Sequence, residues 1–600
     1  MWPFVGSILD DKEDHPFQVF ITGLALSVGL LATVLYGLGV TPARLVTPFV
    51  VLSVIIIGWA VGLLVNPGWL SPQDWLTYWR ETLHSWRQRP FEALLLLAVL
   101  SVLAVGLIHA TYYPFIGDDV LTRYGLQAQA IYQERRIPSS VWGYPPLAPL
   151  TFVSTWFAAG IPNEQLAKLF PIIMGAGTLG ATFLLGKQIV HERAGLLAAA
   201  LVAVTPLFAN NLVIAYVDIP TAFPLTMAIY YMLRWWDSGD VTHALLAGTL
   251  TGIGLITKQS ALTWLPSLLL VPVLWAWTHR DTFIIDRWRR LGNGLFGALF
   301  PVIAIAAPWY LRNIEIGGWE NTLPVAGLFH LLDQQTGLLG LLPPLAWVQD
   351  FGPLTAILYT AGWGLGIWAA LQQARKLPHA DQRDLPADLI LAGFALPYWL
   401  AWWSNFSFDA RFLLQILPIM AIWTARPLSN WIEQVAAIEA HALLRTTAAL
   451  LVVGVVALFG ARGILGGPYR AIVAPFASYE DRLRHAKGDM IALVQYTRSN
   501  LDPDTDRLML MDERMAYYLT EFDVAVMYPL TLADLAETDY LIHASGVFTI
   551  YSDRLGYDES EFYQHIWNPE VFETVYETNG IHVMRVLRSS PPDAADRDEP

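Results

Sequence analysis

Apolar segments long enough to cross a lipid bilayer recur along most of this chain. A helix of about 20 apolar residues spans the hydrocarbon core, where every backbone polar group must be satisfied internally. Segment 147–160 is also apolar but too short to span comfortably, so we expect it to lie in the interface. The sequence therefore predicts a polytopic α-helical membrane protein. About thirteen spanning helices are expected, near 17–39, 43–65, 91–111, 166–187, 194–216, 220–236, 242–257, 260–278, 291–310, 351–371, 388–404, 411–427 and 446–465.

The composition agrees with a protein that lives in a bilayer and excludes other classes. Of 600 residues, 55% are hydrophobic and only 14% are charged. The chain has 25 Trp and 24 Tyr, which are typical of extensive membrane–water interfaces. It has no Cys, which excludes disulfides and thiol catalysis. The net charge is −15, and acidic residues concentrate toward the C-terminus, so we expect no nucleic-acid partner.

Basic residues gather in the loops on one side of the predicted membrane. Cytoplasmic loops carry the excess of Lys and Arg in membrane proteins, so the N-terminus is placed inside. An odd number of spans then places the C-terminus outside, provided that 147–160 does not span. We expect a multi-pass protein of the plasma membrane whose active face and C-terminus are extracytoplasmic. The inner basic residues are Arg80, Arg87, Arg89, Lys187, Arg193, Arg234, Arg280, Arg287, Arg289, Arg290, Arg375, Lys376, Arg383, Arg426 and Arg445.

Charged residues of both signs emerge on the opposite, outer face. Asp118 and Asp119 follow the apolar run 91–110, and two carboxylates are costly to hold where a spanning helix meets water. Carboxylates activate a hydroxyl group or hold a metal ion, whereas fixed cations hold a phosphate. This face therefore predicts a reaction between a membrane-bound phosphate ester and a hydroxyl or amine nucleophile. The other charges that meet it are Asp218, Lys258, Arg312, Asp409 and Arg411.

Several short motifs follow one another in a fixed order between residues 90 and 465, all on the predicted outer face. They are Asp118-Asp119, with Tyr124 and Ala128 in the helix that follows; Tyr144-Pro145-Pro146-Leu147; Asp218 two residues before Pro220; Leu255-Ile256-Thr257-Lys258-Gln259; Pro308-Trp309-Tyr310-Leu311-Arg312-Asn313; and Arg411-Phe412-Leu413-Leu414-Gln415 with Pro418. Because these motifs occur in this order, the chain resembles the GT-C glycosyltransferases. The resemblance is to the group that contains the dolichyl-phosphate-mannose protein mannosyltransferases and the bacterial aminoarabinose transferase for lipid A.

The resemblance implies a membrane glycosyltransferase with a polyprenyl-phosphate-linked sugar as donor. A hexosyl or pentosyl group would pass, with inversion, to a protein, lipid or glycan acceptor on the outer face. The three acidic residues of the motifs are also the candidates for a divalent metal ion, and the metal dependence stays open. The residues assigned by the resemblance are Asp118, Asp119 and Asp218 for catalysis, Lys258, Arg312 and Arg411 for the donor phosphate, and Tyr144, Pro145 and Pro146 for positioning the acceptor or its loop.

Three positions depart from the family's motifs. Asp119 stands where many members have Glu, Gln259 replaces a Gly, and Tyr144 stands where many members have Lys or His. These departures are compatible with the chemistry and leave the sugar and the acceptor open.

Simpler roles compete for the same residues. Asp118 and Asp218 could cap helices, and Arg411 could merely pair with Asp409. Lys258 and Arg312 could snorkel to lipid headgroups.

A transporter or lipid flippase is the alternative class, although the charges gather at one face rather than at the midplane, without inverted repeats. A membrane-anchored binding protein that works through its C-terminal domain is a third class.

The chain divides into four predicted parts. Residues 1–66 hold two N-terminal helices outside the resemblance, and 90–465 form the GT-C-like domain with a long external loop at 112–165. Residues 470–590 are expected to form an extracytoplasmic α/β domain, because short strands near 507–511, 524–527 and 540–543 alternate with helices. Asn579-Gly580 between two further strands is a hairpin signal. The tail 591–600 is expected to be disordered.

Overall fold

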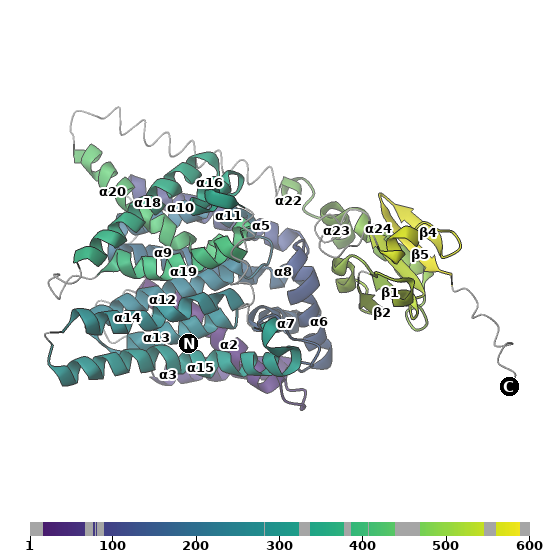
Figure 1. The fold of residues 1–600 in the computed structure, drawn as a ribbon, viewed down its shortest axis with the longest axis horizontal. Coiled ribbons are helices and arrows are strands. Elements are labelled where there is room, and N and C mark those ends of the chain that lie inside the picture. The colour runs from purple at the N-terminus through teal and green to yellow at the C-terminus, as the bar shows by residue number, and fades with distance from the viewer. Residues whose placement is uncertain are drawn as a thin grey trace. The chain divides into compact units, whose positions relative to one another are not determined.

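The computed structural model groups the chain into two compact units (Figure 1). Unit 1 comprises Met1–Thr111 and Ala128–Val473, and unit 2 comprises Tyr112–Gln127 and Ala474–Pro600. The predicted helix at 446–465 and the predicted disordered tail at 591–600 lie outside the described residues. The structure describes residues 16–65, 76–77, 80, 89–280, 282–322, 336–376, 386–405, 407–437, 469–527, 529–544 and 560–587.

Unit 1 is a bundle of helices. Within the described part of the chain, six helices are long and apolar enough to cross a membrane, so the chain is an integral membrane protein. The larger number expected from the sequence stays a prediction. The helices of unit 1 are α2 (Pro16–Gly39), α3 (Pro48–Val65), α5 (Pro90–Tyr112), α6 (Gly125–Glu134), α7 (Leu147–Ala159), α8 (Glu164–Ala167), α9 (Leu169–Ile189), α10 (Glu192–Val204), α11 (Pro206–Asn211), α12 (Asp218–Ser238), α13 (Val241–Leu255), α14 (Leu265–Thr278), α15 (Ile284–Thr322), α16 (Pro343–Ala346), α17 (Val348–Phe351), α18 (Pro353–Lys376), α19 (Ala387–Asn405) and α20 (Leu417–Ala437).

Several helix boundaries differ from the sequence-based expectation, and each has a local cause. The expected span 194–216 is broken between α10 and α11 at Thr205, because Pro206 lacks the amide proton that would continue the ladder. The expected span 291–310 lies within the longer helix α15, which kinks at Gly318 with a φ of 80°. The helical conformation expected at 147–160 is confirmed by α7.

Short 3-10 turns precede two of the helices where continuous spans were expected. Turn η3 (Gln259–Trp264) leads into α14, and turn η7 (Ala410–Gln415) leads into α20. A 3-10 turn is tighter than an α-helix and carries its side chains in different directions. These two turns follow Lys258 and Asp409 directly, so they set where the candidate site residues point.

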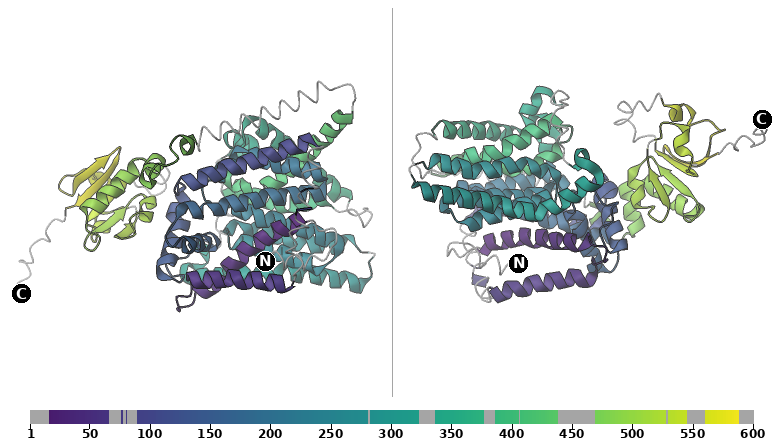
Figure 2. Two further views of the ribbon diagram at one scale, coloured as in Figure 1. Left: turned by 180° about the vertical axis from the view of Figure 1, so that it is seen from behind. Right: turned by 60° about the horizontal axis from the view of Figure 1, so that its bottom comes forward.

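The two N-terminal helices differ in how they pack (Figure 2). Helix α2 contacts α7, α9, α12 and α13. Its side chains form buried hydrogen bonds with α12: Thr22 pairs with the Tyr231 hydroxyl at 2.6 Å, and Gln18 accepts from Tyr230 at 2.7 Å. Helix α3 instead exposes large apolar side chains such as Leu64, which is 83% exposed. Helix α2 is therefore an integral part of the bundle core, whereas α3 presents a lipid-compatible face.

Helix α12 runs between the two ends of unit 1. Asp218 lies in its first turn, while the carbonyls of Trp235 and Trp236 near its last turn accept hydrogen bonds from Arg290.

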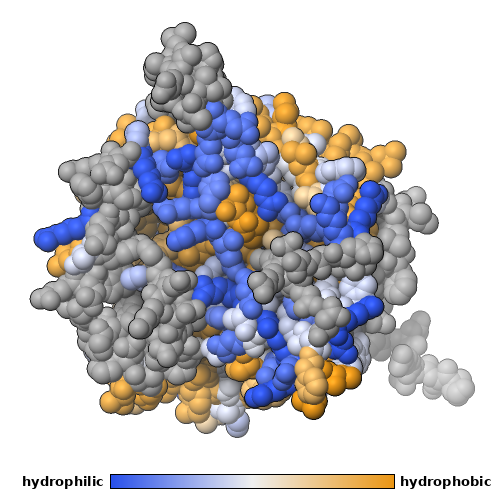
Figure 3. Space-filling view, turned by 90° about the vertical axis from the view of Figure 1, so that its left-hand side faces the viewer, coloured by the Kyte–Doolittle hydropathy of each residue, from blue (hydrophilic) through white to orange (hydrophobic). Residues whose placement is uncertain are grey.

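The end of unit 1 at the left of Figure 1 has hydrophilic residues across its middle and hydrophobic residues around much of its rim (Figure 3). This pattern is typical of helix ends that leave a bilayer.

Unit 2 contains a five-stranded mixed sheet with the order β2-β1-β3-β5-β4. Its α/β character was predicted, and so was the hairpin: Asn579 and Gly580 have φ angles of 43° and 78° between β4 and β5. Between β1 and β2, where the alternating pattern predicted a helix, the chain forms the 3-10 turn η8 (Glu513–Tyr517). The remaining elements are α22 (Tyr469–Val473) just before the unit, then α23 (Tyr479–Lys487), α24 (Asp489–Asn500), β1 (Arg507–Leu510), β2 (Asp523–Val526), η9 (Leu532–Leu535), β3 (Tyr540–Ala544), α26 (Glu561–His565), β4 (Phe572–Thr578) and β5 (Ile581–Val586).

The segment that carries the acidic pair folds as part of unit 2. After α5 the chain forms a short π-helix, η2 (Val120–Tyr124), before α6 begins. The Phe115 ring lies 6.0 Å from that of Tyr517, and the Tyr112 hydroxyl donates to the Ala474 carbonyl at 2.9 Å. The external loop expected at 112–165 is thus divided between the two units.

Candidate active site

Asp218 and Lys258 form a buried ion pair in unit 1. Asp218 stands in the first turn of α12, two residues before Pro220, which suits the start of a helix. Lys258 follows the end of α13, and its Nζ contacts the Asp218 carboxylate. Only 2% of the Asp218 side chain and 17% of the Lys258 side chain are exposed. The two motifs that the sequence separates by forty residues are therefore parts of one site.

Arg411 and Asp409 form a second ion pair next to the first. Arg411 Nε lies 2.7 Å from Asp409 Oδ2, and the Arg411 backbone amide donates to the same carboxylate at 2.9 Å. Burial raises the pKa of Asp409, while Arg411 opposes the shift. The guanidinium stacks at 4.5 Å on the Tyr216 ring. The pairing considered from the sequence is thus confirmed.

The Phe412 ring joins the two pairs into one cluster. Lys258 Nζ lies 4.1 Å from the centroid of this ring, and the Arg411 guanidinium lies 5.0 Å from it. Asp218, Lys258, Asp409 and Arg411 are named here the paired-charge cluster. Two acids and two cations give it no net charge, so it can accept an anion only by reorganising its ion pairs.

Arg312 is engaged with the loop before α7. Its two terminal nitrogens donate to the carbonyls of Val141 and Pro138, each at 2.8 Å. The neighbouring Asn313 accepts from the Gly143 amide at 3.0 Å, and Gln259 donates to the Gly143 carbonyl at 2.8 Å. Arg312, Asn313 and Gln259 therefore fix the backbone of residues 138–143.

The same loop carries the predicted positioning residues. Tyr144 is half-buried, whereas Pro145 and Pro146 are buried, and Pro146 immediately precedes α7. The amide of Leu147 donates to the Ile256 carbonyl at 3.0 Å. The Pro-Pro-Leu element is thereby tied to the chain just ahead of Lys258.

Asp118 and Asp119 lie in unit 2, whereas the other predicted site residues lie in unit 1. The Asp118 side chain is 65% exposed, and its Oδ1 lies 3.3 Å from Arg514 and 3.9 Å from Lys487 Nζ. Asp119 is half-buried and directly precedes η2, without making a side-chain cap there. The water-accessible carboxylate suits a group that exchanges a proton with an acceptor.

Sequence analysis missed Arg514 and Lys487, which contact Asp118. Arg514 follows Asp512 at the end of the buried strand β1, and a cluster of charges directly after a buried strand was the available signal. The hydrogen bond to Asp512 raises the pKa of Arg514, so the guanidinium stays charged. Nothing in the local sequence connects this position with residue 118.

The three candidate metal ligands are divided between the two units. Within the described ranges, no group of three or more His, Asp or Glu side chains gathers closely enough to hold an ion. Asp218 is occupied by the Lys258 ammonium, which competes with a cation for the same oxygen. We derive no step through a divalent ion.

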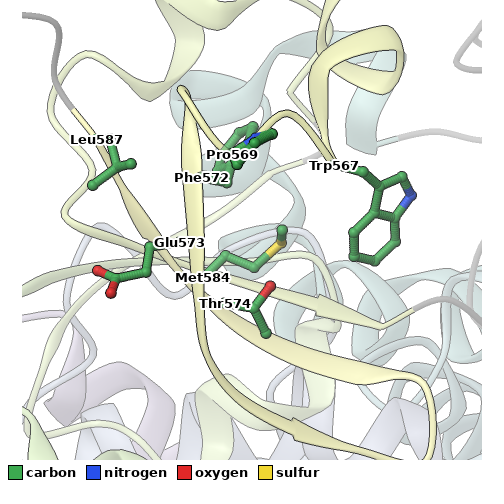
Figure 4. A pocket seen from close by; sticks show the side chains of 7 residues that line it. All are labelled: Trp567, Pro569, Phe572, Glu573, Thr574, Met584 and Leu587. Atoms are coloured by element: carbon green, nitrogen blue, oxygen red, sulfur yellow. The ribbon is translucent and has the colours of Figure 1, made fainter.

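A cavity of about 620 Å³ lies in unit 2 along the edge strand β4 (Figure 4). Its lining includes Phe572 and Met584, which belong to the hydrophobic core beneath the sheet. None of the predicted site residues lines it. The other lining residues are Trp567, Pro569, Glu573, Thr574 and Leu587.

The central part of unit 1 matches a known family. A family model for dolichyl-phosphate-mannose-protein mannosyltransferases matches residues 145–308. This stretch contains Pro145, Pro146, Asp218 and Lys258, which are the loop before α7 and the buried ion pair. The resemblance seen in the ordered motifs is thereby confirmed. No curated protein sequence matches the chain.

Solved structures show the same fold at low identity. ArnT from Cupriavidus metallidurans bound to undecaprenyl phosphate aligns with a TM-score of 0.53 and 15% identity, covering 82% of this chain and 97% of that one. Its apo state aligns with a TM-score of 0.52 and the same identity and coverage. The archaeal oligosaccharyltransferase AglB from Archaeoglobus fulgidus aligns with a TM-score of 0.49 and 14% identity, covering 78% of this chain and 70% of that one. The ArnT alignments show that this chain shares their fold.

Proposed function

We propose that this protein is an integral-membrane GT-C glycosyltransferase that transfers a sugar from a polyprenyl-phosphate donor to an acceptor on the outer face. The buried Asp218–Lys258 pair, within the stretch that matches the mannosyltransferase family model, carries the proposal. The fold shared with ArnT, whose structure holds undecaprenyl phosphate, supports the choice of a lipid-phosphate donor.

The paired-charge cluster would bind the donor phosphate. A phosphate that approaches Lys258 or Arg411 would accept a hydrogen bond from the cation, which would also keep a bond to Asp218 or Asp409. Asp218 and Asp409 then orient the two cations, and charge-assisted hydrogen bonds hold the anion. As the glycosidic bond breaks, the leaving lipid phosphate gains charge, and the same cations stabilise it.

Arg312 was also predicted to bind the donor phosphate. Its bonds to Val141 and Pro138 support a role in holding the loop of Tyr144, Pro145 and Pro146. We propose that Arg312 acts on the donor mainly through this loop.

Asp118 would act as the general base. Its carboxylate would take the proton from the acceptor hydroxyl or amine as this group attacks the anomeric carbon. The oxygen of the lipid phosphate leaves with the bonding electrons from the opposite side, so the anomeric configuration inverts. Asp119 would hold the acceptor or the backbone of η2. A panel of donors and acceptors would identify the sugar and the class of acceptor, whether protein, lipid or glycan.

The membrane topology completes the proposal. We propose about thirteen spans, a plasma-membrane location, and an extracytoplasmic face that carries residues 112–165 and the C-terminal domain. Cysteines introduced at Ser139 and Ser590 of this cysteine-free chain are expected to react with an impermeant thiol reagent added outside intact cells. Labelling of only one of the two positions would contradict the common face.

The deciding experiment supplies the purified protein in vesicles with a panel of polyprenyl-phosphate sugars and acceptors. We expect release of polyprenyl phosphate that depends on one sugar and one acceptor class, and release that is slower by about 10²- to 10⁴-fold with Asp118→Asn. A flippase, the alternative class, would instead move the intact donor across the vesicle without releasing lipid phosphate. That result would overturn the transferase assignment.

A further inference from the structure

The carboxylate proposed as the general base is placed by the C-terminal domain. Tyr112–Gln127 belong to the same compact unit as Ala474–Pro600. Lys487 donates to the Ile116 carbonyl at 2.6 Å, and the Tyr113 ring stacks on His485 at 6.2 Å. These contacts surround the backbone that leads into Asp118. The acidic pair is therefore anchored by residues more than 350 positions later in the chain.

Arg514 reaches from this domain to the Asp118 side chain. Its Nε lies 2.8 Å and 3.1 Å from the two oxygens of Asp512, and a terminal nitrogen donates to Asp512 at 2.6 Å. Asp512 is buried and also caps η8 by accepting from the Arg514 amide at 3.0 Å. A forked pair of this kind fixes the plane of a guanidinium. The other terminal nitrogen then lies 3.3 Å from Asp118 Oδ1.

The Asp118 side chain depends on polar partners for its orientation because most of it is exposed. With 65% of the side chain exposed, packing contributes little to its orientation. A general base works only when it is held within hydrogen-bonding reach of the proton that it removes. Arg514 and Lys487 both approach Oδ1, so this oxygen is held in one place by two charges from the C-terminal domain.

We propose that Arg514 is the positioning residue for Asp118, and that the C-terminal domain is part of the catalytic machinery rather than a stabilising appendage. The inference rests on the proposed function, in which Asp118 accepts the acceptor's proton. It gives the domain beyond residue 474 a task that its own sequence motifs do not reveal.

The test removes the charge of Arg514 without leaving Asp512 unpaired. In the double variant Asp512→Asn, Arg514→Gln, two neutral amides replace the buried pair and can still bond to each other. We expect kcat to fall by about 10- to 100-fold, as for a misplaced catalytic group, while the Kd for polyprenyl phosphate stays unchanged. Arg514→Lys keeps the charge but loses the forked geometry of the guanidinium. We expect its kcat to fall less than that of the double variant.

Arg123 provides the matched control. It pairs with Glu513 at 3.2 Å, so it joins the same two segments next to the same 3-10 turn through a different ion pair. We expect Arg123→Gln to keep kcat within about twofold, because an exposed ion pair contributes little to holding the segments together. An equal loss of kcat in the Arg123 and Arg514 variants would show a merely structural role and overturn the inference.

The outcomes separate this inference from the proposed function. Normal kcat in the folded double variant, with Asp118→Asn inactive, overturns the role of Arg514 and leaves the transferase intact. Full activity of Asp118→Asn overturns the base assignment itself. If the double variant fails to fold, Arg514→Lys carries the test: a loss of kcat with unchanged Kd supports the inference, and unchanged kcat overturns it.

Discussion

The two units hold their acidic residues in opposite ways. The Asp218 side chain in unit 1 is 2% exposed and is neutralised by Lys258, whereas the Asp118 side chain in unit 2 is 65% exposed beside Arg514. Breaking a buried pair leaves an uncompensated charge, so the first pair is coupled to folding. An exposed pair contributes little to stability but can orient a carboxylate. The first arrangement therefore suits binding of a buried anion, and the second suits proton transfer near water.

The largest expected effect belongs to the exposed carboxylate. Asp118→Asn keeps the size of the side chain and removes the base, so we expect turnover to fall by about 10²- to 10⁴-fold. The melting temperature and the affinity for polyprenyl phosphate should stay unchanged, as measured by thermal unfolding and lipid binding in detergent. If a well-folded Asp118→Asn variant transfers the sugar at a near-normal rate, the general base is Asp119 or Asp218 instead. The contrast drawn between the two units would then be wrong.

The buried pair should respond in both stability and binding. Lys258→Ala leaves the Asp218 carboxylate buried and unpaired, which is expected to cost about 3–5 kcal/mol of unfolding free energy. The affinity for polyprenyl phosphate should fall by about ten- to a hundredfold, as for a lost charge-assisted hydrogen bond.

A double variant separates these two effects. Asp218→Asn, Lys258→Gln replaces the pair with neutral amides and should recover most of the stability, but none of the affinity for the lipid phosphate. Recovery of affinity along with stability would show that Lys258 is a structural partner of Asp218, and the donor site would then have to rest on Arg411.

Acid should weaken unit 2 through a buried histidine. Burial, with His582 close by, lowers the pKa of His543 from 6.5 to about 4. The folded unit therefore favours the neutral imidazole, and the unfolded chain binds the proton first as the pH falls. The stabilisation is fully present above pH 6.5 and is lost as the pH falls to about 4, by roughly 3 kcal/mol in total.

Hydrogen exchange on the whole protein would measure this loss. Amides of β3 and β5 should lose protection between pH 7.5 and pH 5, after correction for intrinsic exchange, and His543→Gln should reduce the change. Equal acid sensitivity with and without His543 would place the cause in other groups. Amides close to the paired-charge cluster of unit 1 serve as the internal reference, because that cluster contains no histidine.

The smallest effect is expected at Arg312. Arg312→Ala removes two hydrogen bonds to the loop at Val141 and Pro138, each worth about 1 kcal/mol. We expect faster proteolysis of residues 138–146 and less than a tenfold loss of affinity for polyprenyl phosphate. A loss as large as that of Lys258→Ala would make Arg312 a direct phosphate ligand and enlarge the donor site beyond the paired-charge cluster.

Much of the local structure could be predicted because it depends on local signals. The apolar runs predicted helices at 17–39, 91–111 and 220–236, and α2, α5 and α12 occupy these positions. Asn579-Gly580 predicted its hairpin because both residues tolerate positive φ. The 3-10 turns before α14 and α20 were not predicted, because hydropathy does not distinguish an α-helical turn from a tighter one.

The sequence was enough to identify several residues of the charged site. Only the tertiary structure shows which residues they pair with. The order of motifs by itself identified Asp118, Asp218, Lys258 and Arg411 as candidates, since charges at the ends of apolar helices have few structural reasons to be there. Only the folded chain shows that Lys258 neutralises Asp218 and that Arg514 holds Asp118. The ion pair between Arg514 and Asp118 joins residues that lie 396 positions apart in the chain. Such a contact depends on where β1 ends in the folded sheet, and no local preference of the chain encodes that position.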